Sequence, residues 1–400
     1  MELDKHRSKP ETGLHHHTGI SLIDVLEMDA TCSVVAHRPR RCNHLSSPLM
    51  LAAIVAIAVA TQSAAAQTAA AAQPAWHVQS APDADIWFHG LAVAGFEGFG
   101  PLHMYDPGYA SSVRAEKVRR GLYPTLLDRK AAYLKTAFER DSAFEIMHFV
   151  PLYFLARDGE LLDLMKGMAR PTVQANAPAA KSRGDAVAAV GGVLRSERQR
   201  KLLFEFAEAL DDERRVFYDD FVREASPQSL QSRESLAEFW NDNALPRLAA
   251  FLRILDAPSG LLIVSPALGS EGRSVRLGSG PSALTIVAVG MPRSGDSDRL
   301  TTVSAVRELC FPIVRKAIGT ARTTGMNRVA ADRLSSIAAV RCGSHVIEKF
   351  MPSLLSTYQA RFLRGTGADV PRANLQLAFF AAFPIPQDVD RGIIRALVSH

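Results

Sequence analysis

The chain lacks the motifs of several common enzyme classes. It has no Gly-x-Ser-x-Gly elbow and no Walker loop, which argues against an α/β-hydrolase nucleophile and a P-loop phosphate site. Six histidines follow residue 66, and no two of them have ligand spacing, which disfavours a multi-histidine metal site. No basic stripe is interleaved with aromatic residues, so the sequence predicts no nucleic-acid partner.

The composition is that of an ordinary folded protein. Hydrophobic residues make up 47% and charged residues 22% of the 400 positions. The formal net charge is +5, and residues 1–66 contribute six basic and six acidic side chains, so the remainder carries the same charge. These charges are spread along the sequence, as expected for solvated helix faces.

Long hydrophobic runs are also scarce. The longest uncharged apolar run, Leu49–Ala60, has twelve residues and is too short to span a bilayer comfortably. Basic residues from Arg38 to Arg41 precede it and Ala64-Ala65-Ala66 follows it, which predicts a secretory signal peptide; a membrane anchor is the alternative. We therefore expect an exported protein, periplasmic or extracellular, with no stable membrane span after signal cleavage.

The part before the signal has little pattern. It contains His15-His16-His17, which is either an accident of composition or a metal-binding tract.

We divide the chain into an upstream extension and signal peptide (1–66), a linker (67–75), an N-terminal helical region (76–175), a second helical region (182–256) and a C-terminal region (258–400).

Two of the four cysteines, Cys310 and Cys342, lie beyond the signal. In an exported protein such a pair is expected to form a disulfide, although two buried free thiols are the alternative. Closing this loop of about thirty residues would stabilise the fold by roughly 3–4 kcal/mol.

Local patterns predict helices before residue 258 and a small sheet after it. Helical spacing of apolar residues predicts helices over 109–120, 126–140 and 232–255. Short β-branched runs separated by glycine-rich turns predict three strands near 260–266, 274–277 and 284–290. Two helical stretches separated near Cys342-Gly343 are expected over 328–364. The fold class is therefore α+β, mostly helical, with a small antiparallel sheet that precedes a helix pair.

The first helix of that pair carries the most informative motif. We expect it over 300–319, capped by Thr301 or Thr302 and kinked at Pro312, and its centre reads Arg307-Glu308-Leu309-Cys310-Phe311. The order of sheet, helix and second helix, with a glutamate at this register, resembles the core of gluzincin-type zinc metallopeptidases and related exported bacterial proteins. The resemblance covers residues 261–363, about a quarter of the chain.

The resemblance implies a role for each residue of the motif. Glu308 stands where the general base of His-Glu-x-x-His would be, while Arg307 and Phe311 replace the two histidine ligands. Arginine only donates hydrogen bonds and phenylalanine has no lone pair, so neither side chain can ligate zinc. We therefore expect no cofactor, with zinc as the alternative.

The second helix of the pair would supply the third ligand. His345 or Glu348 stands near that place, and His345 is either a weak metal candidate or a partly buried histidine. Adjacent residues of a helix do not face each other, so we expect Glu308 to pair with Arg341, Lys349 or His345 rather than with Arg307. Such an ion pair would fill the vacated metal site.

Two other groups of residues are weaker candidates. Glu145 and His148 form a single Glu-x-x-His, the half-motif of di-iron bundles, with core-like neighbours. Gly95, Gly98 and Gly100 depart from the dinucleotide-binding spacing and predict a loop. Near that loop, His89, His103 and Tyr105 with Glu97 are candidates to line a cleft.

From these observations we expect an exported, soluble protein whose metallopeptidase-like core has lost its zinc ligands. Its first expected function is non-catalytic binding of an extended peptide or protein segment at the sheet edge beside the Glu308 helix. One alternative is a residual metal-dependent hydrolase that uses Glu308 as general base. The other is a structural protein of the cell envelope.

Overall fold

The computed structural model describes residues 75–98, 100–140, 144–155, 160–168, 194, 196–280, 283–291, 297–321, 326–371 and 373–398. All of them belong to a compact unit that spans Ala53–His400. The expected signal peptide, the His15–His17 tract and the linker lie outside these residues. Among the helices in the described ranges, none is both long and apolar enough to cross a membrane.

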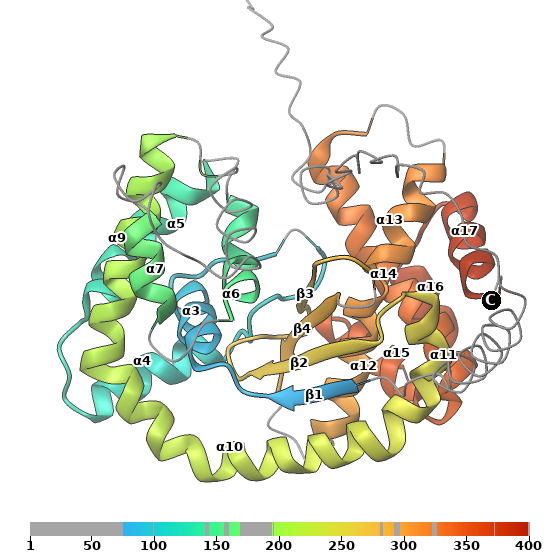
Figure 1. The fold of residues 1–400 in the computed structure, drawn as a ribbon, viewed down its shortest axis with the longest axis horizontal. Coiled ribbons are helices and arrows are strands. Elements are labelled where there is room, and N and C mark those ends of the chain that lie inside the picture. Colours follow the sequence, from blue (N-terminus) through green and yellow to red (C-terminus); the bar gives the residue numbers. More distant parts are fainter. Residues whose placement is uncertain are drawn as a thin grey trace, which may run out of the picture. The chain divides into compact units, whose positions relative to one another are not determined.

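A four-stranded mixed sheet lies at the centre of this unit (Figure 1). The strands are β1 (Ala75–Gln79), β2 (Ser259–Ser265), β3 (Arg273–Leu277) and β4 (Leu284–Gly290), in the order β1-β2-β4-β3. The pairs β1–β2 and β2–β4 are parallel, and only β3 runs antiparallel, beside β4. The α+β, mostly helical class is thus confirmed. Of the three expected strands, β3 and β4 are antiparallel as predicted, β2 and β4 are parallel instead, and β1 was not predicted.

The parallel β1–β2 pair brings together two distant parts of the chain. Trp76 of β1 is in register with Gly260 of β2, and a Cβ atom on Gly260 would lie 2.5 Å from the Trp76 ring. Trp76 also packs against Trp240, with ring centroids 5.7 Å apart. The N-terminal region therefore supplies an edge strand to the sheet of the C-terminal region.

Helices from the N-terminal part surround α3 (Pro82–Val93), whose residues Ile86, Trp87, Phe88 and Leu91 are fully or almost fully buried. These elements are α4 (Tyr109–Arg119), α5 (Leu126–Glu139), the 3₁₀ helix η1 (Phe144–His148), α6 (Val150–Tyr153), α7 (Glu160–Met168) and α9 (Glu197–Glu213). The helices predicted over 109–120 and 126–140 are confirmed as α4 and α5.

From α9 onward the chain stays helical to residue 254. Two π-helical segments, η2 (Arg214–Tyr218) and η3 (Trp240–Ala244), join α9, α10 (Asp219–Phe239) and α11 (Leu245–Ile254). Figure 1 shows α10 running alongside β1, and the two elements are in contact.

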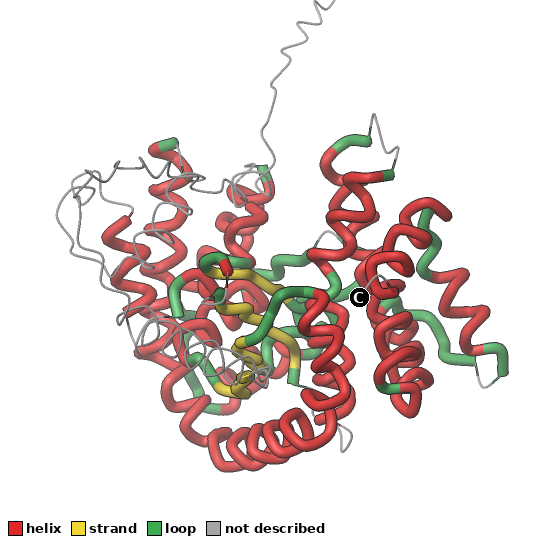
Figure 2. The backbone as a smooth tube through the Cα atoms, turned by 45° about the vertical axis from the view of Figure 1, so that its right-hand side comes forward, coloured by secondary structure: helices red, strands yellow, loops and turns green. Residues whose placement is uncertain are grey.

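The C-terminal helices are α12 (Ser297–Leu309), α13 (Phe311–Thr320), α14 (Arg328–Phe350), the 3₁₀ turn η5 (Pro352–Leu354), α15 (Leu355–Gly365), α16 (Leu375–Ala382) and α17 (Gln387–Val398). Figure 2 shows helices on both sides of the yellow strands, and among the C-terminal helices it is α12 that contacts β3 and β4. The expected break near Cys342-Gly343 is wrong, because α14 continues through it. Gly343 instead permits close packing, since an added Cβ would lie 2.1 Å from the Tyr358 hydroxyl.

Candidate functional site

The helix that carries Glu308 is α12, which follows β4 and packs on β4 and α14. It begins at Ser297, so Thr301 and Thr302 are buried inside it rather than at its cap. It ends at Leu309 because Pro312, in the first turn of α13, has no N–H to continue the ladder. The single helix expected over 300–319 with a kink at Pro312 is therefore wrong: the chain forms two helices that are separated at Cys310, and Phe311 lies beyond the end of α12.

Arg307 is the centre of a buried ion-pair cluster. Its guanidinium group contacts the carboxylate of Glu308, donates to Ser336 Oγ at 2.7 Å and lies 3.7 Å from Glu271 Oε1. The side chain is fully buried and stacks over the Phe311 ring at 5.0 Å. The expectation that Arg307 and Glu308 would not meet is therefore wrong: the long arginine side chain bends back to its neighbour.

Glu308 is held by the turn before β3. The backbone N–H of Gly272 donates to Glu308 Oε1 at 2.9 Å, and Ser274 Oγ donates to the Glu308 carbonyl oxygen at 2.9 Å. Gly272 permits this approach, because a Cβ there would lie 2.3 Å from the Ala288 carbonyl oxygen. Glu308 itself is fully buried.

A second ion pair completes the cluster. Arg273 Nη1 donates to Glu271 Oε1 at 2.7 Å, and the Arg273 guanidinium lies 5.5 Å from the centre of the Phe149 ring. Two glutamates and two arginines thus balance one another. Burial alone would lower the pKa of Arg307, but attraction to Glu308 and Glu271 raises that pKa above its ordinary value. The arginine stays charged and cannot act as a metal ligand.

An extended segment at residues 103–105 pairs with the turn that carries Glu271. The Gly269 N–H donates to the Met104 carbonyl oxygen at 2.7 Å, and Tyr105 forms an antiparallel bridge with Leu268. Upstream of this segment, a Cβ on Gly100 would lie 2.8 Å from Glu271 Oε2. The glycine loop predicted around Gly95–Gly100 therefore packs over Glu271.

Of the four residues proposed to line a cleft near that loop, two contact each other and the other two contact residues outside the group. His103 and Glu97 form a half-exposed pair at 3.9 Å. His89 is buried, where it contacts Glu213 at 3.0 Å, and Tyr105 contacts His148 Nδ1 at 2.8 Å. Glu145 and His148 lie on the 3₁₀ helix η1 rather than on an α-helix.

The candidates on α14 face another element. Arg341 Nη2 lies 3.1 Å from Asp390 Oδ2, His345 Nε2 lies 3.0 Å from Asp390 Oδ1, and Lys349 donates to the Leu397 carbonyl oxygen. Glu348 is exposed. These residues bind α17, so none of them is the partner of Glu308 that the sequence suggested. The α14 residue that reaches the cluster is Ser336.

Cys310 and Cys342 are both buried free thiols, so the expected disulfide is not formed in this structure. The two thiols interact with each other, and burial with that contact raises the pKa of Cys310. The raised pKa of Cys310 disfavours its thiolate, which is the nucleophilic form of a thiol. The alternative of two free thiols is the one that the structure contains.

Sequence reasoning missed Glu271, Arg273 and Ser336. Glu271 and Arg273 flank Gly272 in a glycine-rich turn, where charged residues are common. Ser336 is one of two adjacent serines in α14, and nothing in the sequence distinguishes it from the other. No local signal distinguishes them, because the cluster joins residues from distant parts of the chain. Within the described ranges, no group of three His, Cys, Asp or Glu side chains is placed to hold a metal ion.

The site therefore defines a class: an α+β protein with a buried, charge-balanced cluster on the helix that follows its sheet. Comparisons with protein-family models, curated proteins and solved structures found no match for this chain. The gluzincin-type relationship stays a prediction.

Proposed function

We propose that this is a non-catalytic peptide- or protein-binding protein whose metallopeptidase-like core is held together by ion pairs. The observation that carries the proposal is the position of Arg307. Its guanidinium group lies between Glu308 and Glu271 and bonds to Ser336, which fills the space beside the glutamate with a permanent positive charge.

A residual hydrolase is the second candidate, and the geometry counts against it. A general base has to reach water or a metal-bound water, yet Glu308 is fully buried and paired. Both Glu271 and Glu308 keep one carboxylate oxygen, Oε2, without a hydrogen-bond partner. A catalytic zinc site has three protein ligands, and these two oxygens would supply only two.

The proposed binding surface is the outer edge of β3. Among the described strands, β3 is terminal in the sheet and pairs only with β4; α6 also contacts it, and we infer that its outer edge accepts an added strand beyond that contact. The first residue, Arg273, is covered by Phe149, whereas Arg276 is exposed. The segment around Tyr105 pairs with Leu268 just before β3, and this pairing supports the proposal that extended backbone can be added here.

The test is a peptide-binding screen with the full chain, followed by hydrogen exchange of any complex. We expect an extended peptide to slow amide exchange within 274–277 and to leave exchange in α17 unchanged. Protection confined to other elements would contradict binding at this edge. A screen without a binder would favour the structural envelope role instead.

A further inference from the structure

The outer edge of β3 is flanked by a different helix on each face of the sheet. Successive side chains of a strand point to opposite faces. Ser274 Oγ donates to the Glu308 carbonyl oxygen, so its face is the one that α12 covers. The Arg273 guanidinium group lies over the Phe149 ring, 5.5 Å from its centre, and α6 contacts β3. A strand added beside β3 would therefore alternate between the α12 side and the α6 side.

The α6 side of this edge is aromatic. Phe149 and Tyr153 lie one helical turn apart, because the Tyr153 N–H donates to the Phe149 carbonyl oxygen at 3.3 Å, and they therefore share one side of the segment. Both are only partly buried, although Val150 and Leu152 between them are fully buried. The core thus fixes this segment and leaves its two rings partly accessible to a bound chain.

The α12 side continues into α13, which carries Arg315 and Lys316 on its exposed face. Among the residues that the structure describes, Arg315 forms neither an ion pair nor a hydrogen bond. Its charge nevertheless reaches the aromatic side: burial raises the pKa of Tyr153 to about 12, while Arg315 lowers that pKa and Glu145 raises it. In the view of Figure 1, β3 lies between α6 and α13. The edge thus has two rings on one side and a cation without an ion-pair partner on the other.

We propose that this edge selects an extended peptide in which apolar and acidic side chains alternate. The inference rests on the proposed strand addition at β3 and names its partner class. Apolar side chains of the added strand pack on Phe149 and Tyr153, while the side chains between them point to the other face, where Arg315 binds a carboxylate. Apolar contact supplies most of the affinity, and the ion pair, which is open to solvent, supplies a smaller share that discriminates between peptides.

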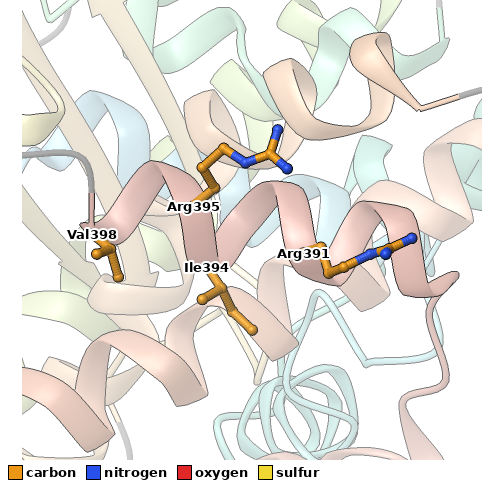
Figure 3. Close-up of a pocket in the computed structure, with 4 residues that line it drawn as sticks. All are labelled: Arg391, Ile394, Arg395 and Val398. Carbon is orange, nitrogen blue, oxygen red and sulfur yellow. The ribbon is translucent and has the colours of Figure 1, made fainter.

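The test is fluorescence anisotropy of the full chain with three labelled heptapeptides. The acidic probe is Thr-Val-Asp-Val-Asp-Val-Thr, and lysine or threonine replaces both aspartates in the basic and neutral probes. Their residue order is symmetric, so a probe can bind in either strand direction. The variant Arg315→Glu is compared with Arg391→Glu, a matched control at an exposed arginine that lines a hollow on α17 (Figure 3). A circular-dichroism spectrum checks that each variant folds.

We expect the unaltered chain to bind the acidic probe about threefold more tightly than the neutral probe, and the basic probe most weakly. Arg315→Glu should reverse the order of the acidic and basic probes, and Arg391→Glu should leave it unchanged. Added salt should narrow the difference. Equal affinities for the three probes, or an unchanged order in Arg315→Glu, overturn this selection; strand addition survives if a bound probe still slows amide exchange within 274–277. Absence of binding by all three probes overturns both proposals.

Discussion

The guanidinium group of Arg307 contacts the carboxylate of Glu308, its immediate neighbour in α12, although helix geometry points their Cβ atoms in different directions. The contact forms because both side chains turn toward one buried place, between the Gly272 N–H and Ser336. The charge of the glutamate is thereby matched within the helix that carries it. This pairing is the basis of the proposed non-catalytic role.

Removal of that arginine should destabilise the protein strongly. Arg307→Met leaves Glu308 and Glu271 buried without their shared cation, which costs about 3–5 kcal/mol. Urea unfolding followed by circular dichroism measures the loss. Arg253→Met is the control, because Arg253 is exposed on α11 and should change stability by less than about 0.5 kcal/mol.

A double variant separates charge from packing. Arg307→Met combined with Glu308→Gln removes the unpaired charge of Glu308 and keeps the Glu271–Arg273 ion pair, so it should recover part of the loss. If the double variant is as unstable as Arg307→Met alone, the cluster does not act through charge balance.

Glu213 should make the stability sensitive to acid. It is buried between His89 and Lys117, and although burial itself would raise its pKa, hydrogen bonds and attraction from these two residues lower it from 4.5 to about 2. A carboxylate with a lowered folded-state pKa stabilises the fold above pH 4.5, and this contribution is lost as the pH falls from 4.5 toward 2.

The expected size of this acid-sensitive contribution is about 3 kcal/mol. Glu213→Gln should therefore be less stable at pH 7 and lose less stability between pH 4.5 and 2, as read from unfolding curves across that range. Glu208→Gln, on the exposed face of the same helix, is the control. An identical acid profile for the two variants would contradict the assignment.

Asp85 should have the opposite effect on the pH dependence. Burial raises its pKa from 3.8 to about 7, against the weaker influences of Ser265 and Arg233. Between these two values the unfolded chain has released its proton while the folded chain keeps it. Stability therefore falls as the pH rises from 3.8 to 7 and then levels off.

Asp85→Asn cannot ionise and should be more stable than the unaltered chain above pH 7, by on the order of 2 kcal/mol once partial solvent screening is allowed for. Thermal unfolding at pH 5 and pH 8 measures the difference. Asp163→Asn, at an exposed position, should show none. A gain that is the same at both pH values would show that ionisation of Asp85 is not its cause.

Gly343 should be intolerant of a side chain. The Tyr358 hydroxyl group donates to the Val340 carbonyl oxygen at 2.8 Å and lies where the methyl group of an alanine would stand. Gly343→Ala should destabilise the fold by about 1–3 kcal/mol, measured by urea unfolding. Gly319→Ala is the control, since a Cβ there meets nothing within 4 Å.

Removal of the clashing hydroxyl group provides a rescue. The double variant Gly343→Ala/Tyr358→Phe should recover only part of the loss, because the closest atom is removed while the ring carbon Cζ stays 2.7 Å from the added Cβ. If the two losses simply add, the contact between α14 and Tyr358 is not the reason for the glycine.

Local sequence signals account for many elements but not for their pairing. The β-branched runs predict β2 and β4, and the apolar periodicity predicts α4 and α5 within a residue at each end. The direction of the strands was not predictable, because the β1–β2 pair joins Trp76 to Gly260 across most of the described chain. Short runs specify a strand but not its neighbour.

The candidate site was predictable only in part. The sequence singles out Glu308 and shows that Arg307 and Phe311 cannot ligate zinc. It does not show which groups approach Glu308, because Gly272 and Ser336 are brought to it by the sheet and by α14. The cations proposed from α14, Arg341 and His345, lie on the helix face that binds Asp390.

The most direct test of the central claim is the zinc content of the purified full chain after dialysis against zinc, measured by mass spectrometry of the metal. The account predicts neither stoichiometric zinc at this site nor a peptidase activity that depends on Glu308. Zinc retained equally by the unaltered chain and Glu308→Ala, without peptidase activity, would belong elsewhere, for example at His15–His17. One zinc ion per chain with a peptidase activity that is lost in Glu308→Ala would contradict the account, whether or not the zinc itself is lost, because the glutamate of His-Glu-x-x-His is the base and not a ligand.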